Sequence, residues 1–220
     1  MEFASLYAFA RGPLVWVAFI VLFLGSVYKL ARMFVLAKKD KVVYPYMSLK
    51  FGLRSLMHWV TPFASRNMRL NPGMTLATFA FHFCLLATPI LLMAHNVLLY
   101  ESWGIRLPTL PESAADAMTL VVVLVALFFL ARRLFVPVAA YVTASSDWVV
   151  LLIAVAPFVT GFIATQGWLH YKTMLLLHIF SGALWLMAIP FTRLSHMLYF
   201  VFTRSYMGSE FGAVRNARDW

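Results

Sequence analysis

Long, largely uncharged stretches alternate with short polar ones along this chain. Five of these stretches are close to or longer than the ~20 apolar residues that an α-helix needs to cross the hydrocarbon core of a bilayer. Lipid offers no water to unpaired peptide groups, and stretches of this length are too long for the strands of a membrane barrel. We therefore predict five membrane-spanning helices, at residues 13–37, 74–100, 115–137, 148–169 and 173–203.

Composition places the chain among integral membrane proteins. The sequence is 63% hydrophobic and only 12% charged, whereas roughly a quarter of the residues of a soluble domain are charged. The sequence shows no internal repeat, and residues 38–72 are the longest region outside the predicted spans. We expect a single membrane domain over residues 1–220, with the fold of an all-α bundle of five helices.

The positions of Lys and Arg predict the orientation of the bundle. Of the 18 Lys and Arg residues, all but Arg11, Arg106 and Lys172 fall on one side. The positive-inside rule makes this side cytoplasmic, so the N-terminus should lie outside and the C-terminus in the cytoplasm. Residues 38–72, with the amphipathic sequence LKFGLRSLMHWVTPF, then form a basic cytoplasmic segment. The net charge of +10 follows from this topology and requires no nucleic acid; it also suits anionic lipid or an acidic docked subunit.

Four histidines lie within the predicted spans, and their spacing suggests two pairs. His178 and His196 are 18 residues apart, which in one continuous helix returns both to the same face about 27 Å apart. The second span runs in the opposite direction, so His82 should lie level with His196, and His95 level with His178. His95 lies about 140° from the face of His82 in a straight helix, although Pro89 between them is positioned to kink it.

An ionisable side chain inside a membrane is costly and is therefore a candidate functional group. Paired neutral imidazoles on facing helices suit an iron between them, because each ring offers one nitrogen. We interpret the pairs as ligands of two b-type haems, an inner one at His82 and His196 and an outer one at His95 and His178. The alternative for any single histidine is a hydrogen bond to a neighbouring helix. His58 and His170 are interpreted as interfacial.

Other chemistry finds little support in the sequence. The single cysteine, Cys84, can form neither a CxxCH haem attachment nor the ligand set of an iron-sulphur cluster, so any cluster belongs to a partner. No Ser/His/Asp set, phosphate loop or pair of carboxylates stands out. Two alternatives to a cytochrome remain: a cofactor-free transporter or channel, for which Pro157 and Gly161 suggest a discontinuous fourth helix, and a structural anchor.

Several segments resemble a known family. AIPFTRLSH at residues 188–196, with His178 upstream, resembles the last helix of the gamma subunit of respiratory nitrate reductase, a five-helix di-haem cytochrome b. FHFCLLA around His82, YESW at 100–103 and ARRLFVP at 131–137 resemble the same family. The resemblance covers nearly the whole chain in topology and implies the same two haems, with His82 and His196 on the inner one and His95 and His178 on the outer one.

Two features depart from that family. The histidines of the second span are three residues further apart than in the nitrate reductase subunit, and the loop LPTLPESAADAM lacks the lysine found near that subunit's quinol pocket. The basic segment with SRNMRLNPG is more similar to relatives in transmembrane redox complexes of sulphate-reducing bacteria. There the cytochrome subunit sits beside a cytoplasmic iron-sulphur protein and serves a periplasmic cytochrome c.

The expected function is electron transfer within a respiratory oxidoreductase complex of a bacterial or archaeal cytoplasmic membrane. Electrons would pass between a periplasmic donor, or the quinone pool, and a cytoplasmic iron-sulphur subunit, beside other membrane subunits. Menaquinone is a further candidate cofactor, as the substrate of quinol oxidation or quinone reduction. Its candidate contacts near the outer haem are Asn96, Tyr100 and Arg106. Arg193, Arg132 and Arg133 are candidates to pair with the propionates of the inner haem, although positive-inside anchoring accounts for them equally well.

Overall fold

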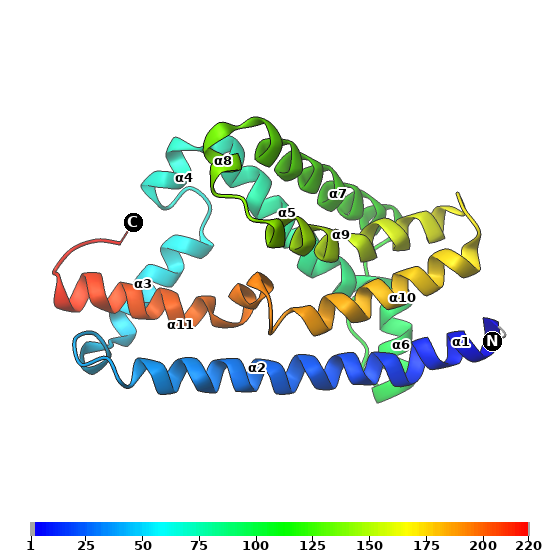
Figure 1. Ribbon diagram of the computed structural model, residues 1–220, viewed down its shortest axis with the longest axis horizontal. Helices are drawn as coiled ribbons and strands as arrows, with labels where there is room; N and C mark the ends of the chain where they lie inside the picture. The colour runs from blue at the N-terminus through cyan, green and yellow to red at the C-terminus, as the bar shows by residue number, and fades with distance from the viewer. Residues whose placement is uncertain (1–2, 220) are drawn as a thin grey trace. The chain divides into compact units, whose positions relative to one another are not determined.

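A computed structural model describes residues 3–219, most of which are helical, and no strand occurs in this range (Figure 1). Five helices are long and apolar enough to cross a membrane: Phe3–Ala37, Pro72–Leu91, Glu112–Phe135, Ser145–Gln166 and Tyr171–Ala188. The prediction of an all-α membrane protein with five such helices is confirmed. The elements in chain order are α1 (Phe3–Phe9), η1 (Ala10–Leu14), α2 (Val15–Ala37), η2 (Tyr44–Tyr46), α3 (Leu49–Val60), α4 (Arg66–Leu70), α5 (Pro72–Leu91), α6 (Met93–Trp103), α7 (Glu112–Phe135), α8 (Pro137–Tyr141), α9 (Ser145–Gln166), α10 (Tyr171–Ala188), η3 (Arg193–Ser195), α11 (His196–Ser209) and η4 (Glu210–Val214).

The first span begins at Phe3, earlier than the predicted start at residue 13. Pro13 lies inside the helix, within the π-helical turn η1. A proline there has no N–H to donate and its ring crowds the carbonyl one turn earlier. The wider π turn accommodates that ring without ending the helix, so proline marks an irregular turn here and not a helix start.

The third and fourth spans lie close to their predicted positions, residues 115–137 and 148–169. Helix α7 ends at Phe135, just before Val136 and Pro137, because a residue that precedes proline disfavours helical geometry. Helix α9 ends where Gly167 takes a left-handed conformation, with φ 65°, the usual way in which a glycine closes a helix.

The helix predicted over residues 173–203 is two helices in the structure. Helix α10 ends at Ala188 and α11 begins at His196, with Pro190 between them. The Thr192 hydroxyl donates to the Ala188 carbonyl at 2.8 Å and accepts from the Leu194 amide at 3.2 Å, so it closes one helix and caps the short turn that follows. His178 and His196 therefore do not share a continuous helix, and the prediction that they share one face of it is wrong.

The chain forms two compact units, of which the first comprises residues 1–12 and 77–185. Its core lies among α5, α7 and α9. Trp185 of α10 packs edge-on against Phe158, with ring centroids 6.0 Å apart. The outer faces of the same helices are apolar, as lipid requires, and Phe83 is 68% exposed. The buried core residues are Phe81, Cys84, Leu85, Val122, Ala126 and Phe158.

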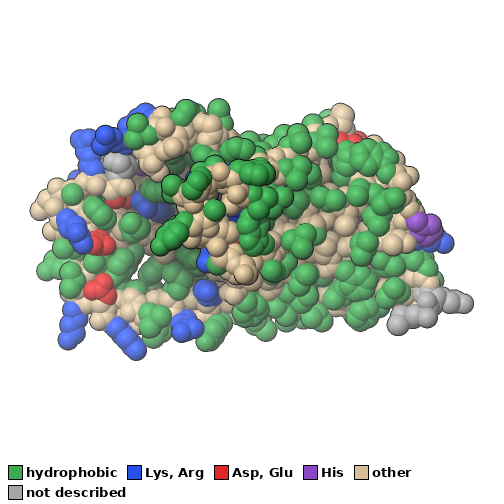
Figure 2. Space-filling view, turned by 45° about the horizontal axis from the view of Figure 1, so that its top comes forward, with side chains coloured by type: hydrophobic (Ala, Val, Ile, Leu, Met, Phe, Trp, Pro, Cys, Tyr) green, Lys and Arg blue, Asp and Glu red, His purple; other side chains and the backbone are tan. Residues whose placement is uncertain are grey.

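The second unit comprises residues 13–76 and 186–220. Helix α3, from the amphipathic segment, packs closely against α11. A Cβ at Gly208 would overlap the Phe51 carbonyl, and a Cβ at Gly212 would overlap the Phe51 ring, so glycine allows the two helices to touch. The opposite side of α3 leaves Leu49 79% exposed. Figure 2 shows Lys and Arg side chains gathered at the left of the view, and seven of the 18 Lys and Arg residues lie in residues 38–72 of this unit.

A buried ion pair ties the end of the second unit to α3. Arg204 of α11 contacts the carboxylate of Asp219 at 2.5 Å, and their side chains are only 11% and 1% exposed. Arg204 also donates to the Ser55 hydroxyl at 2.9 Å and lies 4.3 Å from the Trp59 ring centroid. Burial lowers the pKa of the Arg204 guanidinium, and the neighbouring Asp219 carboxylate raises it. Burial is the larger effect, so the pKa of Arg204 is lowered overall and the ion pair offsets only part of the cost of burying both charges.

Candidate metal centre

The second predicted span, residues 74–100, is interrupted in the structure. Helix α5 ends at Leu91, Leu92 takes an extended conformation (φ −69°, ψ 130°), and α6 begins at Met93. Pro89 lies two residues before the end of α5. Because proline cannot donate to the carbonyl four residues earlier, the helix is weakened just before the break. The break changes the direction in which residues of α6 project relative to those of α5.

Breaking a helix leaves carbonyl groups that need new partners, most of all inside a membrane. Side chains from the next turn supply two of these partners, and the loop before α7 supplies a third. The hydrogen bonds run from His95 Nδ1 to the Pro89 carbonyl (2.9 Å), from Asn96 Nδ2 to the Ile90 carbonyl (3.0 Å) and from the Leu110 amide to the Leu91 carbonyl (2.9 Å). The break therefore fixes the position of the His95 ring.

Asn96 holds this break together. It is 7% exposed. Its amide nitrogen donates to the Ile90 and Leu92 carbonyls, at 3.0 and 3.2 Å, and its amide oxygen accepts from the Leu107 amide at 3.1 Å. Both amide donors are thus committed to the main chain. The structure gives Asn96, predicted to contact a quinone, a structural role. Tyr100 and Arg106 are exposed, and the Arg106 guanidinium lies 4.1 Å from the Tyr100 ring centroid.

His178 lies on α10 and is held by the neighbouring helix α9. Its Nδ1 donates to the Pro157 carbonyl at 2.8 Å. Gly161, one turn further along α9, faces the same ring, since a Cβ built there would lie 2.8 Å from His178 Nδ1. Thr160 and Ser181 bridge the same two helices through their hydroxyl groups at 3.3 Å. In the sequence, Pro157 and Gly161 suggested only a discontinuous helix. In the structure, both residues lie against His178, a predicted ligand.

The rings of His95 and His178 lie together. Their centroids are 5.8 Å apart and their planes 18° from parallel, and both side chains are half-buried. A carbonyl oxygen only accepts hydrogen bonds, so each Nδ1 carries the proton and each Nε2 keeps its lone pair. A metal ion takes that neutral nitrogen. The structure thus brings the predicted outer pair together with the tautomers that metal binding needs.

His95 and His178 would hold a haem iron through their two Nε2 atoms, and the haem would supply one-electron redox chemistry. The main-chain carbonyls behind both rings are the usual outer partners of metal-bound histidines, and the smallness of Gly161 leaves room for one of the rings. Within residues 3–219 no three His, Cys, Asp or Glu side chains cluster in a way that could hold a metal ion. The residues present at this pair fit a haem.

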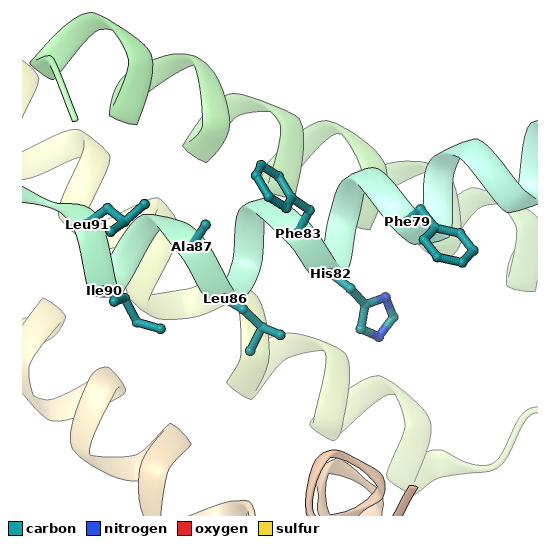
Figure 3. Close-up of a pocket in the computed structure, with 7 residues that line it drawn as sticks. All are labelled: Phe79, His82, Phe83, Leu86, Ala87, Ile90 and Leu91. Carbon is teal, nitrogen blue, oxygen red and sulfur yellow. The ribbon is translucent and has the colours of Figure 1, made fainter. Parts of the chain in front are cut away.

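His82, predicted for the inner haem, projects from the first unit into an apolar groove along α5. The groove is shallow and open, and all of the residues that line it belong to α5. His82, Leu86 and Ile90 project to the same side of the helix (Figure 3). His82 Nδ1 bonds to the Thr78 carbonyl at 2.8 Å. The residues lining the groove are Phe79, His82, Phe83, Leu86, Ala87, Ile90 and Leu91.

His196, the other residue predicted for the inner haem, belongs to the second unit. It is the first residue of α11, its side chain is exposed, and its Nδ1 bonds to the Arg193 carbonyl at 2.7 Å. All four predicted ligands therefore direct Nδ1 to a main-chain carbonyl. His58 does the same, to Arg54 at 2.8 Å, whereas His170 contacts the Thr173 hydroxyl at 3.0 Å. A hydrogen bond from Nδ1 to a main-chain carbonyl therefore does not by itself mark a ligand. The close approach of the two rings is what distinguishes His95 and His178.

The three arginines predicted for the inner haem have different environments. Arg133 lies 3.4 Å from the carboxylate of Asp147, which is 5% exposed, and donates to the Thr143 hydroxyl at 3.0 Å. Asp147 also accepts from the Ala144 amide at 2.9 Å, at the start of α9. Arg133 thus stabilises the connection between α7 and α9. Arg132 is half-buried near the end of α7, and Arg193 is exposed in η3.

Comparison with known proteins reveals a relative. A protein of Nitratidesulfovibrio vulgaris strain Hildenborough is 35% identical over 218 residues, an alignment that covers 96% of this chain and 95% of the relative. The chain belongs to that protein's family. The relative's name, "Protein", states no activity. No family model matches the chain, and no solved structure matches it. The family therefore indicates a shared fold along the whole chain, and the function has to be argued from the site.

Proposed function

We propose that this protein is a b-type cytochrome subunit of a membrane redox complex, with one haem b held between His95 and His178. The observation that carries the proposal is the approach of these two rings within one compact unit, 5.8 Å apart and nearly parallel. Here both Nδ1 protons point to main-chain carbonyls, which leaves the nitrogens that bind metals.

A second haem b, at His82 and His196, is part of the same proposal. The pairing comes from the sequence and from the resemblance to the nitrate reductase gamma subunit. The structure contributes one supporting observation, which is that His82 lies beside a shallow apolar groove along α5. An apolar groove beside an imidazole suits the flat hydrophobic face of a macrocycle.

When bound, the haems supply one-electron redox chemistry across the width of the membrane. The chain contributes three things to that chemistry. Apolar spans surround the ligands with a low dielectric, which favours neutral imidazoles. Main-chain carbonyls fix the tautomer and orientation of each ring. The break at Leu92 turns His95, on α6, toward His178, on α10.

The direction across the membrane follows from the charges. An N-terminus outside and a C-terminus in the cytoplasm put the basic residues of α3, α4 and α11 on the cytoplasmic side, according to the positive-inside rule. A basic face there suits an acidic region of a cytoplasmic iron-sulphur subunit, or anionic lipid. On the other side the electron donor would be a periplasmic cytochrome c or the quinone pool, as in the families that this chain resembles.

A quinone contact near the outer haem is left with Tyr100 and Arg106 as its candidates, because Asn96 is committed to the helix break. Both remaining side chains are exposed. Addition of a menaquinol analogue to the isolated protein, with the reduced haem spectrum as the readout, tests this contact. Reduction that an Arg106→Gln variant slows supports a menaquinone site here. The absence of reduction would leave the periplasmic cytochrome c as the donor.

A pyridine haemochrome assay on the purified protein, normalised to protein, tests the proposal as a whole. We expect two haems b per chain. One haem would leave only the pair that the geometry supports, His95 with His178, and would remove the role of His82 and His196. A chain without haem would contradict the proposal and favour a transporter subunit or a structural anchor.

A further inference from the structure

Helix α9 contributes no predicted ligand, yet it contacts His178 through two backbone features. The Pro157 carbonyl accepts the Nδ1 proton of His178 at 2.8 Å. One turn later, Gly161 faces the edge of the same ring. Pro157 is buried and Gly161 is half-buried, so both contacts lie away from solvent. Two residues one turn apart on the same face of α9 therefore provide the hydrogen-bond acceptor of the His178 ring and the space that the ring occupies.

The space beside Gly161 is shown by the distances from a Cβ atom placed on this residue to its neighbours. A Cβ at this position would lie 2.8 Å from His178 Nδ1 and 3.0 Å from its Cε1. Non-bonded carbon atoms pack at about 3.5–4.0 Å, so any side chain here would push the imidazole away from α9. Gly161 has an ordinary helical conformation. Its φ is not positive, unlike the φ of Gly104 and of Gly167. Its small size, and not backbone freedom, is what the site uses.

We infer that α9 sets the orientation and donor strength of His178, with Pro157 and Gly161 as positioning residues of the outer haem site. The inference rests on the proposed function. A histidine that donates Nδ1–H to a buried carbonyl becomes a better electron donor through Nε2. A stronger donor stabilises the oxidised form of an iron centre, so this hydrogen bond lowers the reduction potential of the outer haem. Movement of the ring away from Pro157 should raise that potential.

Gly161→Ala tests the inference, with Gly182→Ala as a matched control. Gly182 lies on α10, one turn after His178, and a Cβ there would meet nothing within 4 Å. Both variants add the same methyl group to a spanning helix. The readouts are a redox titration of the purified holoprotein and the low-spin signals of its oxidised form. The haem at His82 and His196 serves as an internal reference in the same sample.

The expected result is an upward shift of one component of the titration in Gly161→Ala, while the second component and both components of Gly182→Ala stay as in the parent protein. Loss of one haem from Gly161→Ala alone would support the same conclusion, because the displaced ring no longer binds. Unchanged potentials and signals in Gly161→Ala would overturn the inference. A parent protein without haem would overturn the proposed function instead, and so the two failures are distinguishable.

A second experiment applies even if Gly161→Ala does not assemble. His178→Gly removes the imidazole and leaves space for an added one. We expect 4-methylimidazole, which keeps an N–H for the Pro157 carbonyl, to restore the six-coordinate spectrum. The isomer 1-methylimidazole has no N–H to donate and should bind about tenfold more weakly, the effect of one lost hydrogen bond to a buried acceptor. Equal affinities of the two isomers would overturn the inference.

Discussion

The imidazole rings of His95 and His178 lie 5.8 Å apart and 18° from parallel, each held from behind by a main-chain carbonyl of a proline. Pro89 holds His95 from the preceding helix, and Pro157 holds His178 from the neighbouring one. Both carbonyls accept a proton from Nδ1. The pair is thus oriented by backbone groups and not by charged side chains, which suits a site in the low dielectric of a membrane.

This pairing predicts a non-additive result. His95→Ala and His178→Ala should each remove one haem of two, because an iron with one axial histidine is held much less firmly. The double variant should lose no more than either single variant, as measured by haemochrome content per chain. His170→Ala is the control, since His170 is exposed and its ring bonds to the Thr173 hydroxyl, and it should keep both haems. A double variant that loses both haems would contradict the pairing.

The break between α5 and α6 predicts that substitution of Asn96 lowers the stability of the protein. Asn96→Ala removes a buried side chain with three hydrogen bonds to the main chain, so the Ile90 carbonyl and the Leu107 amide lose these partners, whereas the Leu92 carbonyl keeps the backbone amide of residue 96. We expect a loss of about 2–4 kcal/mol in the free energy of unfolding, measured by circular dichroism in mixed detergent. Asn71→Ala is the control, because Asn71 is exposed and its side-chain amide bonds to Asn67, one turn earlier. Similar losses in both variants would contradict a structural role for Asn96.

The spans could be predicted from the sequence because length and apolar character alone define them. The breaks at Leu92 and Pro190 could not, because both lie within apolar stretches whose composition does not change. A proline in a spanning helix can be tolerated, as Pro13 and Pro157 are, or can precede a break, as Pro89 does. Which outcome occurs depends on whether other groups satisfy the freed carbonyls.

The four candidate histidines could be singled out from the sequence because histidines are rare in membrane spans. The arrangement of these histidines could not be predicted. The angle between His82 and His95 assumed one straight helix over the second span, and the common face of His178 and His196 assumed one straight helix over the fifth. The positioning role of Pro157 and Gly161 depends on which side of α9 faces α10. Neither residue carries a polar side chain that would signal this from sequence.

The ion pair at the start of α9 predicts different effects for two arginines. Arg133→Gln removes the ion pair between Arg133 and the buried Asp147 carboxylate, so we expect a loss of about 1–3 kcal/mol in the free energy of unfolding. Arg215→Gln breaks a pair with Glu210 in which Arg215 is 60% exposed, and the change should stay within about 0.5 kcal/mol. Equal changes would contradict the structural role of Arg133. Haem content should be the same in both variants.

Arg193 allows a separate test of the inner haem. Its side chain is exposed in η3, and its carbonyl accepts from His196 Nδ1 at 2.7 Å. If the guanidinium pairs with a propionate of the haem at His82 and His196, Arg193→Gln should raise the negative charge felt by that haem and lower its reduction potential. The backbone carbonyl persists in the variant, so ligation by His196 should not change. A redox titration with both components unchanged would remove this role.

The close packing of α3 on α11 predicts opposite effects for two glycine substitutions. A methyl group at Gly208 would overlap the Phe51 carbonyl and crowd Ser55, whose Cβ lies 2.6 Å from the added atom. The backbone of α3 cannot yield as a flexible side chain would, so Gly208→Ala should destabilise the protein by about 1–3 kcal/mol.

Gly73, near the start of α5, has nothing within 4 Å of the same added atom. Gly73→Ala should therefore leave stability unchanged or raise it by up to about 1 kcal/mol, the helix propensity that alanine adds. Thermal unfolding of both variants in one detergent measures the difference. A Gly208→Ala protein as stable as Gly73→Ala would mean that α3 does not rest on α11. The amphipathic segment would then be held by lipid alone, and the buried contacts of Arg204 with Ser55 would have to be absent as well, because they depend on the same close approach.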